Sequence, residues 1–402
     1  MSGKPVNVQI AGAGVAALEA ALALQALAEG RVSVDLVAPE TEFTYRPLAV
    51  AEPFAVAEVK RFPLHTLVEA AGAALRAGSV TAVDAEQKII RLADGSEVDY
   101  DVLLLALGGV PREAVTGALT FRGPQDSQAL AGLLDQITAG EVRRIAFAVP
   151  AGTSWPLPLY ELAILTAEYV AAHGTRDIEL SLVTSEDRPL ALFGPAASDA
   201  VAELLDLRGI NVETSVVPVW FDNGVLALVP DRRLAADSVV ALPKLEGPRL
   251  PGVPHDESGF VPTDEFGWVL GLSDVYAAGD LTQFPLKQGG TAAQQADAAA
   301  ASIAADAGAA LKPEAFKPVL RGLLLTGFLP RFLRAEATGT HSVVDTEPLW
   351  WPPAKIIGRY LSPFLAAKLG LPESAGGPLR EGAVPIEVEL DPTSGRPAWS
   401  RV

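Results

Sequence analysis

The sequence contains no cysteine in its 402 residues. Disulfide bonds, zinc–thiolate sites, iron–sulfur clusters and redox-active dithiols all require cysteine, so the sequence excludes each of them. Any electron transfer by this chain would have to use a bound cofactor. Histidine is almost as scarce, because only His65, His173, His255 and His341 are present and no two of them stand at metal-ligand spacing. We therefore expect no metal site.

Positive charge is also in short supply. The chain has 31 Lys and Arg residues against 49 Asp and Glu, which gives a formal net charge of −18 at pH 7. Nucleic-acid binding requires clustered Lys and Arg, so this balance argues against a nucleic-acid partner. The same charge would repel anionic lipid headgroups over most of the surface.

Long hydrophobic runs are missing as well. No apolar stretch reaches the roughly 18 residues that a membrane-spanning helix needs, and the nearest candidate, residues 320–333, is interrupted by Arg321, Pro330 and Arg331. The first apolar run, residues 6–10, leads into a glycine turn and does not resemble a signal peptide. We expect a cytoplasmic protein with at most peripheral membrane contact.

The predicted elements alternate between strands and helices. A strand at residues 6–11, a helix at 15–29 and a strand at 31–37 form a β-α-β unit, which is typical of a parallel sheet. A strand, turn and helix recur at residues 144–172. We predict an α/β fold with two Rossmann-like dinucleotide-binding domains, the second nested in the first, and a C-terminal α+β segment.

The expected domain boundaries follow from this pattern. The first domain takes residues 1–115 and 245–312, the second takes 116–244, and the C-terminal segment takes 313–402. Less regular stretches give the remaining predictions: helices at about 64–75 and 354–369, one strand at 211–217, and a final strand at 386–390.

A glycine-rich turn follows the first strand. Gly12 permits the tight turn, Gly14 allows a pyrophosphate to approach the helix N-terminus, and Ala17 is small enough for the helix to pack on the strand. The spacing predicts a dinucleotide site. The second strand ends near Ala38, where such sites carry an acidic residue for the ribose, so Glu40 becomes the candidate for that contact.

A second glycine turn carries a family resemblance. The strand at 275–278, the Gly279-Asp280 pair and the Ala-rich helix after them resemble the flavin-contact motif of two-dinucleotide-domain flavoproteins. The resemblance implies that the first domain binds FAD non-covalently, with Asp280 on the ribityl chain. It further implies that the start of the following helix, at Gly289 and Gly290, faces the flavin pyrimidine edge. Two further stretches are similar to that family: residues 100–109, which include Gly108, and the adenine-side strand that begins at Val80.

Within this superfamily, the FAD-dependent pyridine nucleotide-disulfide oxidoreductases, the chain most resembles the branch of sulfide:quinone oxidoreductases and type II NADH dehydrogenases. The resemblance lies in residues 43–48, which include Arg46 and Pro47, and in the stretch from Lys287 to Gly290. It implies that Lys287 holds the N1/C2=O edge of the flavin; a plain solvated lysine is the alternative. The branch oxidises sulfide with cysteines, and this chain has none, so that thiol mechanism is excluded.

The turn of the second Rossmann unit departs from the usual glycine-rich pattern. Residues 149–161 contain one glycine and three prolines, and proline lacks the N–H that would hold a phosphate. NAD(P)H binding is therefore not favoured, although Glu186 is placed to read a ribose. Glu161 is either a proton relay or a first-turn carboxylate that complements the helix dipole. Tyr160 and Trp155 line either an acceptor pocket or the core.

The C-terminal segment has three interpretations. In the branch named above it helps to form a quinone site and a membrane contact, and here the apolar stretches 322–329 and 356–369 and the pair Trp350-Trp351 suit that role. Lys355, Arg359 and Lys368 would then face lipid. The alternatives are packing on the flavin domain and a homodimer interface.

These observations predict an FAD-dependent oxidoreductase that passes electrons from an unidentified small-molecule donor to an acceptor, with a quinone as one candidate. The candidate catalytic residues are Lys287, Glu161 and Tyr160. Two alternatives are left open: an NAD(P)H-dependent FAD reductase, and a flavin-binding protein without catalytic activity.

Overall fold

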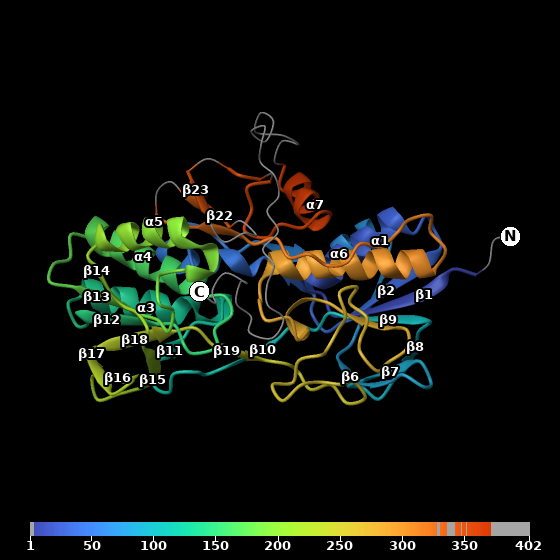
Figure 1. The fold of residues 1–402 in the computed structure, drawn as a ribbon, viewed down its shortest axis with the longest axis horizontal. Coiled ribbons are helices and arrows are strands. Elements are labelled where there is room, and N and C mark those ends of the chain that lie inside the picture. Colours follow the sequence, from blue (N-terminus) through green and yellow to red (C-terminus); the bar gives the residue numbers. More distant parts are fainter. Residues whose placement is uncertain (1–3, 328–329, 336–341, 347, 351, 371–402) are drawn as a thin grey trace.

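The first parallel sheet forms one half of the molecule (Figure 1). A computed structural model describes residues 4–327, 330–335, 342–346, 348–350 and 352–370. The sheet has the strand order β20-β9-β1-β2-β5, and its inner strand β9 is a continuous apolar run because both faces of the sheet are covered. The strands are β1 (Val6–Ala11), β2 (Val32–Ala38), β5 (Ala74–Ala77), β9 (Val102–Leu105) and β20 (Val275–Ala277). The helices α1 (Val15–Leu27) and α6 (Gly289–Asp306) lie side by side on one face.

A second parallel sheet forms the other half, with the strand order β11-β18-β12-β13-β14. Its strands are β11 (Leu119–Thr120), β12 (Arg144–Ala148), β13 (Glu179–Val183), β14 (Ile210–Glu213) and β18 (Ser238–Ala241). Its helices are α3 (Ser127–Thr138), α4 (Leu157–Ala172) and α5 (Pro195–Asp206). The two sheets confirm the predicted α/β fold with two Rossmann-like units.

The chain crosses between the halves twice at one place. β10 (Val110–Arg112) leads out of the first half, and β19 (Lys244–Glu246) leads back and pairs with it antiparallel. The second sheet is therefore built from a continuous insertion between β9 and β20. This topology brings the C-terminal ends of both parallel sheets toward the space between the halves.

Small antiparallel sheets accompany the two parallel sheets. They consist of β3 (Glu42–Thr44) with β4 (Arg61–Pro63), β6 (Val80–Asp84) with β7 (Ile89–Leu92) and β8 (Glu97–Asp99), β15 (Val217–Asp222) with β16 (Val225–Val229) and β17 (Arg232–Ala235), and β21 (Arg321–Leu324) with β22 (Arg331–Ala335) and β23 (Ser342–Asp345). The last of these confirms the expected small α+β segment, to which α7 (Leu361–Lys368) also belongs. Short 3₁₀ turns are η1 (Arg46–Leu48), η2 (Glu52–Phe54), η3 (Pro124–Asp126), η4 (Ala191–Phe193) and η5 (Gly279–Leu281).

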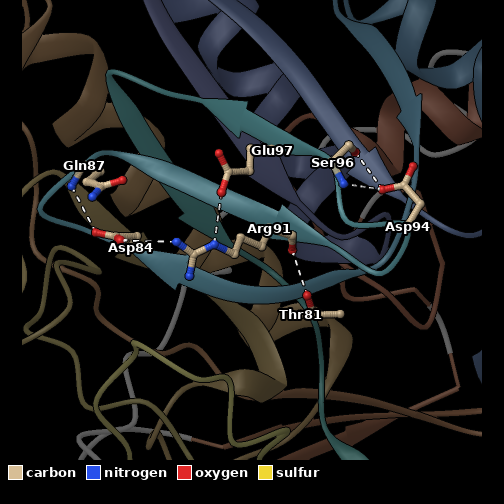
Figure 2. Close-up of polar contacts among 7 residues, drawn as sticks. All are labelled: Thr81, Asp84, Gln87, Arg91, Asp94, Ser96 and Glu97. Carbon is tan, nitrogen blue, oxygen red and sulfur yellow. Dashed lines mark hydrogen bonds and ion pairs between the residues drawn. The ribbon is translucent and has the colours of Figure 1, made fainter.

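The sheet of β6, β7 and β8 carries a chain of polar contacts on its exposed face. Figure 2 shows Arg91 between two acids, at 3.6 Å from Asp84 and 3.1 Å from Glu97. Asp84 also accepts a hydrogen bond from the backbone N–H of Gln87, so its carboxylate stabilises the turn between β6 and β7. Surface pairs of this kind contribute little to stability.

Several predicted elements differ from those observed. The helix α2 (Leu64–Ala70) stops early because Gly72 adopts a left-handed φ of +65°, after which β5 begins. The single strand predicted at 211–217 is instead β14 followed by β15. The helix predicted at 354–369 begins only at Leu361. The strand predicted at 386–390 and the residue Trp351 lie outside the described residues.

No helix within the described ranges combines the length and the apolar character needed to cross a bilayer.

Candidate functional site

A cavity of about 760 Å³ lies where the C-terminal ends of the strands meet. Parallel α/β sheets bind ligands in this position, because loops and helix N-termini converge there. Ten of the sequence-predicted cofactor residues line it: Gly12, Gly14, Glu40, Arg46, Pro47, Val80, Gly108, Gly279, Asp280 and Gly289. Lys287 and Glu161, two of the three predicted catalytic residues, line it as well.

The first glycine turn forms one wall of the cavity. Gly12 has a φ of +118°, and a Cβ at this position would overlap the carbonyl oxygen of Ala106. Gly14 is the N-cap of α1, and a Cβ built on it would meet no atom within 4 Å. Ala17 is fully buried behind the turn, where it packs in the apolar cluster under α1. The turn thus leaves an open approach to the amide groups at the start of α1.

The second glycine turn forms the opposite wall. Gly279 has a φ of +83°, and a Cβ there would press on Ala16 and Ala292. Asp280, the next residue, lines the cavity, and no described residue donates a hydrogen bond to its carboxylate. Burial raises the pKa of Asp280, while the charges of Lys287 and Arg46 lower it. The oxygens of Asp280 are therefore available to accept hydrogen bonds from ligand hydroxyl groups in the cavity.

Lys287 is held beside Asp280, and the structure does not show a plain solvated lysine. Its side chain is buried, its ammonium lies 3.8 Å from the centroid of the Phe260 ring, and it donates a hydrogen bond to the carbonyl oxygen of Thr282. Burial lowers the pKa of Lys287 to about 8, against the opposing charges of Asp280 and Asp256. The ammonium is therefore a cation at pH 7 that loses its proton just above that pH.

The start of α6 faces the same space. Gln288 is the N-cap and accepts a hydrogen bond of 2.9 Å from Gly290, so the amide of Gly290 is already used. Gly290 does not line the cavity, whereas Gly289 and Ala292 do. Glu40 and Arg46 are exposed residues at the edge of the cavity.

A buried ion pair that the sequence did not predict closes one end of the cavity. Glu161 at the start of α4 is fully buried, and both of its carboxylate oxygens lie 2.6 Å from the ammonium of Lys355. Glu161 also accepts a hydrogen bond from Leu325, and Lys355 donates one to the carbonyl of Pro47. Burial raises the pKa of Glu161, and the charge of Lys355 opposes that shift.

This pair corrects one sequence-based interpretation. Lys355 does not face a lipid surface, because its side chain is only 7% exposed and its ammonium is paired with the carboxylate of Glu161. No local pattern could signal this pairing, since 194 residues separate the two positions. The pair joins α4, the loop at Pro47 and the C-terminal segment.

Tyr160 does not reach the cavity. Its hydroxyl donates a hydrogen bond of 2.7 Å to Glu186 and accepts one from the backbone of Leu190, deep in the second half of the molecule. The structure therefore places Tyr160, predicted as a catalytic residue, outside this cavity. Trp155 does line the cavity, and its indole packs edge-on against Phe193 with ring centroids 5.6 Å apart.

A smaller apolar cavity of about 190 Å³, here called the acceptor pocket, adjoins the main one. Leu323, Lys355 and Ile356 line both cavities and so form the wall between them. The remaining lining residues are Tyr45, Leu48, Lys60, Phe62, Pro352, Pro353, Ala354, Ser362, Leu365, Ala366 and Leu369. Most of them are apolar, and many come from the C-terminal segment.

The charge of Lys287 gives the site a pH dependence that can be measured. The cation is present below its pKa of about 8 and is lost above it. We expect the affinity of the flavin-free protein for FAD to fall about tenfold between pH 7 and pH 9, the size of one charge-assisted hydrogen bond. Lys287→Met should make the affinity low and independent of pH, whereas the exposed control Lys312→Met should behave like the wild type. A constant affinity of the wild type over this range contradicts the predicted contact between Lys287 and the flavin.

The sequence is similar to known proteins in two respects. Residues 6–145 match the sequence profile of the pyridine nucleotide-disulphide oxidoreductase family. Over 293 residues, the chain is 27% identical to an NADH dehydrogenase-like protein of Mycobacterium tuberculosis, a match that covers 68% of this chain and 72% of that protein.

Comparison of the folds agrees with the sequence. The sulfide:quinone oxidoreductase of Aquifex aeolicus has a TM-score of 0.77 at 16% identity, covering 85% of this chain and 86% of that one. The structure of NDH2 from Plasmodium falciparum in complex with NADH has a TM-score of 0.58 at 18% identity, covering 69% and 64%. Residues 6–145 are thus similar in sequence to the pyridine nucleotide-disulphide oxidoreductase family, and the two nested sheets have the fold of these solved structures.

Proposed function

We propose that this chain is an FAD-dependent oxidoreductase that takes electrons from a donor other than NAD(P)H and passes them to a small apolar acceptor such as a quinone. One observation carries the proposal. A single cavity holds both glycine turns and the unpartnered Asp280, and it shares a wall that contains a buried Glu–Lys pair with an apolar pocket.

The residues present fit FAD. The open Gly12–Gly14 turn and the N-terminus of α1 would hold the pyrophosphate, and Asp280 would accept hydrogen bonds from the ribityl hydroxyls. Lys287 and the N-terminus of α6 supply positive potential beside Asp280. Bound there, FAD would supply the two-electron exchange that the cysteine-free chain cannot perform with its own side chains.

The Glu161–Lys355 pair suits the acceptor side of this reaction. A quinone that gains two electrons also takes up two protons, and a buried pocket must provide them without bulk water. The ammonium of Lys355 lines both cavities and stands 2.6 Å from Glu161, so it holds a proton at Nζ on the wall of the acceptor pocket. The charge of Glu161 keeps that proton on Nζ until it is transferred, and the neutral amine then regains a proton from solvent. The pair thus supplies one of the two protons, and the other would accompany the electrons from the cofactor.

The second Rossmann unit does not fit a nicotinamide dinucleotide. Its turn places Pro156 at the N-cap of α4 and Pro158 in the first turn, so two amides that would hold a phosphate are missing. Glu186, the candidate for a ribose contact, accepts hydrogen bonds from Tyr160 at 2.7 Å and from Thr184 at 2.9 Å. A carboxylate that already satisfies two inner hydroxyls is poorly placed to bind ribose.

An NAD(P)H-dependent reductase is the second candidate, favoured by the likeness to an NADH dehydrogenase-like protein. The cofactor that both candidates require is tested first, by denaturing the purified protein and quantifying the released flavin. We expect close to one FAD per chain. A chain that neither retains FAD nor binds it on reconstitution contradicts the proposal.

Anaerobic mixing then identifies the donor and the acceptor. We expect no bleaching of the flavin absorbance by NADH or NADPH within minutes, and rapid re-oxidation of the dithionite-reduced protein by a short-chain quinone. Fast bleaching by either nucleotide supports the second candidate. Failure of both nucleotides and the quinone to react supports a flavin-binding protein without catalytic activity.

A further inference from the structure

Two acidic side chains meet between α1 and α6, outside both cavities. Glu19 on α1 is fully buried, and Asp297 on α6 is hydrogen-bonded to it. One oxygen of Asp297, Oδ1, is buried with no hydrogen-bond partner among the described residues. Figure 1 shows the two helices packed along each other over the first sheet. The proposed reaction uses neither acid.

The carboxylate of Glu19 anchors residues 352–369, the part of the C-terminal segment to which this name refers from here on. Its two oxygens accept hydrogen bonds from the backbone N–H groups of Tyr360 at 2.7 Å and Leu361 at 2.8 Å. These amides open α7, where a negative charge is favourable. The backbone passes so close that a Cβ at Gly358 would overlap the carboxylate.

This segment supplies the wall of the site. It carries Lys355 and Ile356 to both cavities, and its helix α7 covers the acceptor pocket with Leu365 and Ala366. Ser362 fixes the turn before α7, because its hydroxyl accepts from Gly358 and donates to Ile356. The position of Lys355 therefore depends on how firmly the segment is anchored.

Two carboxyl groups can hydrogen-bond to each other only if one carries a proton. Glu19 accepts from two backbone amides, so the proton belongs to Asp297. The charged and titratable groups that face the pair from the segment are Arg359 and the hydroxyl of Tyr360. Arg359 lowers the pKa of Asp297, but burial and the charge of Glu19 prevail and raise it to about 9.

We propose that Glu19 and Asp297 are positioning residues that form a proton-linked anchor, in which one shared proton fixes the C-terminal segment against α1 and α6. Only the consequence for Lys355 as a proton donor rests on the proposed function. The anchor itself stands on the contacts of Glu19 and on the pairing of the two acids.

The sign of the pH effect follows from proton linkage. When the segment leaves, water reaches both carboxyl groups, and the pKa of Asp297 returns toward its ordinary value of 3.8. Between that value and about 9, the anchored form holds one more proton than the released form. Anchoring is therefore strongest at low pH, and it weakens by up to tenfold for each unit that the pH rises within this window.

The absence of cysteine makes the anchor measurable, because one introduced thiol is the only one in the chain. Ala366→Cys places it on α7 at a site 7% exposed, and the exposed Lys312→Cys serves as the reference. The ratio of the two rates of labelling by an aromatic disulfide reagent cancels the ionisation of the thiol itself. We expect this protection ratio to fall about tenfold per pH unit between pH 6 and pH 9.

Two variants test the role of the shared proton. Asp297→Asn keeps a hydrogen-bond donor that does not titrate, so the protection ratio should vary less than about twofold over the same range. Glu19→Gln loses the charge that faces α7, so its protection should be lower, and it should vary less with pH than in the wild type because burial alone then raises the pKa of Asp297. A slope in either variant that equals that of the wild type, or no slope in the wild type, overturns the proposal.

A third thiol separates local release from general unfolding. Ala146→Cys in β12 is 1% exposed and lies in the second half of the molecule. Its labelling should stay slow across the whole range, and a rise in parallel with Ala366→Cys would also overturn the proposal. None of these measurements needs bound flavin or turnover, so their failure is distinguishable from failure of the proposed function.

Discussion

Gly12→Ala should abolish FAD retention. The backbone of Gly12 has a φ of +118°, and the added Cβ would overlap the carbonyl oxygen of Ala106, which belongs to the backbone and cannot turn aside. Strain and overlap together should cost about 3 kcal/mol or more of folding free energy. They also displace the start of α1, where the pyrophosphate would bind. The flavin content of the purified protein and its melting temperature measure both effects.

Gly117→Ala is the matched control for this experiment. Gly117 has a φ of +86°, and a Cβ there would overlap the carbonyl oxygen of Phe221, but the residue lies outside the cavity. The melting temperature should fall as it does for Gly12→Ala, while the folded protein keeps its FAD. Equal loss of flavin in both variants would show that instability, and not the turn, explains the result.

Lys355→Met should destabilise the protein by about 3–5 kcal/mol, because it leaves a fully buried carboxylate without its counter-charge. The pKa of Glu161 is already raised by burial and should rise further in the variant. Since the folded state then holds more protons than the unfolded state, stability should fall as the pH rises from 5 to 8. Chemical denaturation at several pH values measures this loss.

A double-mutant cycle isolates the pair. Glu161→Leu combined with Lys355→Met removes both charges, and the double variant should lose clearly less stability than the sum of the single variants. The exposed pair of Arg188 and Asp199 provides the control, because Arg188→Met should change stability by less than about 1 kcal/mol. Additive losses at Glu161 and Lys355 would mean that the two charges do not interact. In the proposed reaction, Lys355→Met should also slow quinone reduction.

The first glycine turn shows how much of the site can be predicted from local sequence. Gly12, Gly14 and Ala17 stand within six residues between an apolar strand and an Ala-rich helix, so their arrangement needs no knowledge of the rest of the chain. The structure places both glycines on the wall of the cavity and Ala17 behind it. The Gly279-Asp280 turn follows the same logic, since a strand, a left-handed glycine and a helix again lie close together in sequence.

Predictions failed where a residue's environment comes from distant segments. The sequence groups Lys355 with Arg359 and Lys368 as a cation that would face lipid. Packing instead brings Lys355 to Glu161 and buries it. Tyr160 adjoins Glu161 in sequence, yet the helical turn sends its hydroxyl toward Glu186 on the opposite side. The predicted helix at 354–369 fails before Leu361 because backbone N–H groups there donate to side chains instead of to helical carbonyls: Ile356 to Tyr45, Gly358 to Ser362 and Tyr360 to Glu19.

The sequence by itself determined the fold class, the two glycine turns and the exclusion of thiol chemistry, because each depends on residue type and short spacing. Tertiary structure alone decided which charges pair. Glu161 with Lys355, and Glu19 with Asp297 and the start of α7, are contacts across 194 to 342 residues. A charge is tolerable in the interior only beside a partner, and the fold, not the local sequence, brings that partner to it.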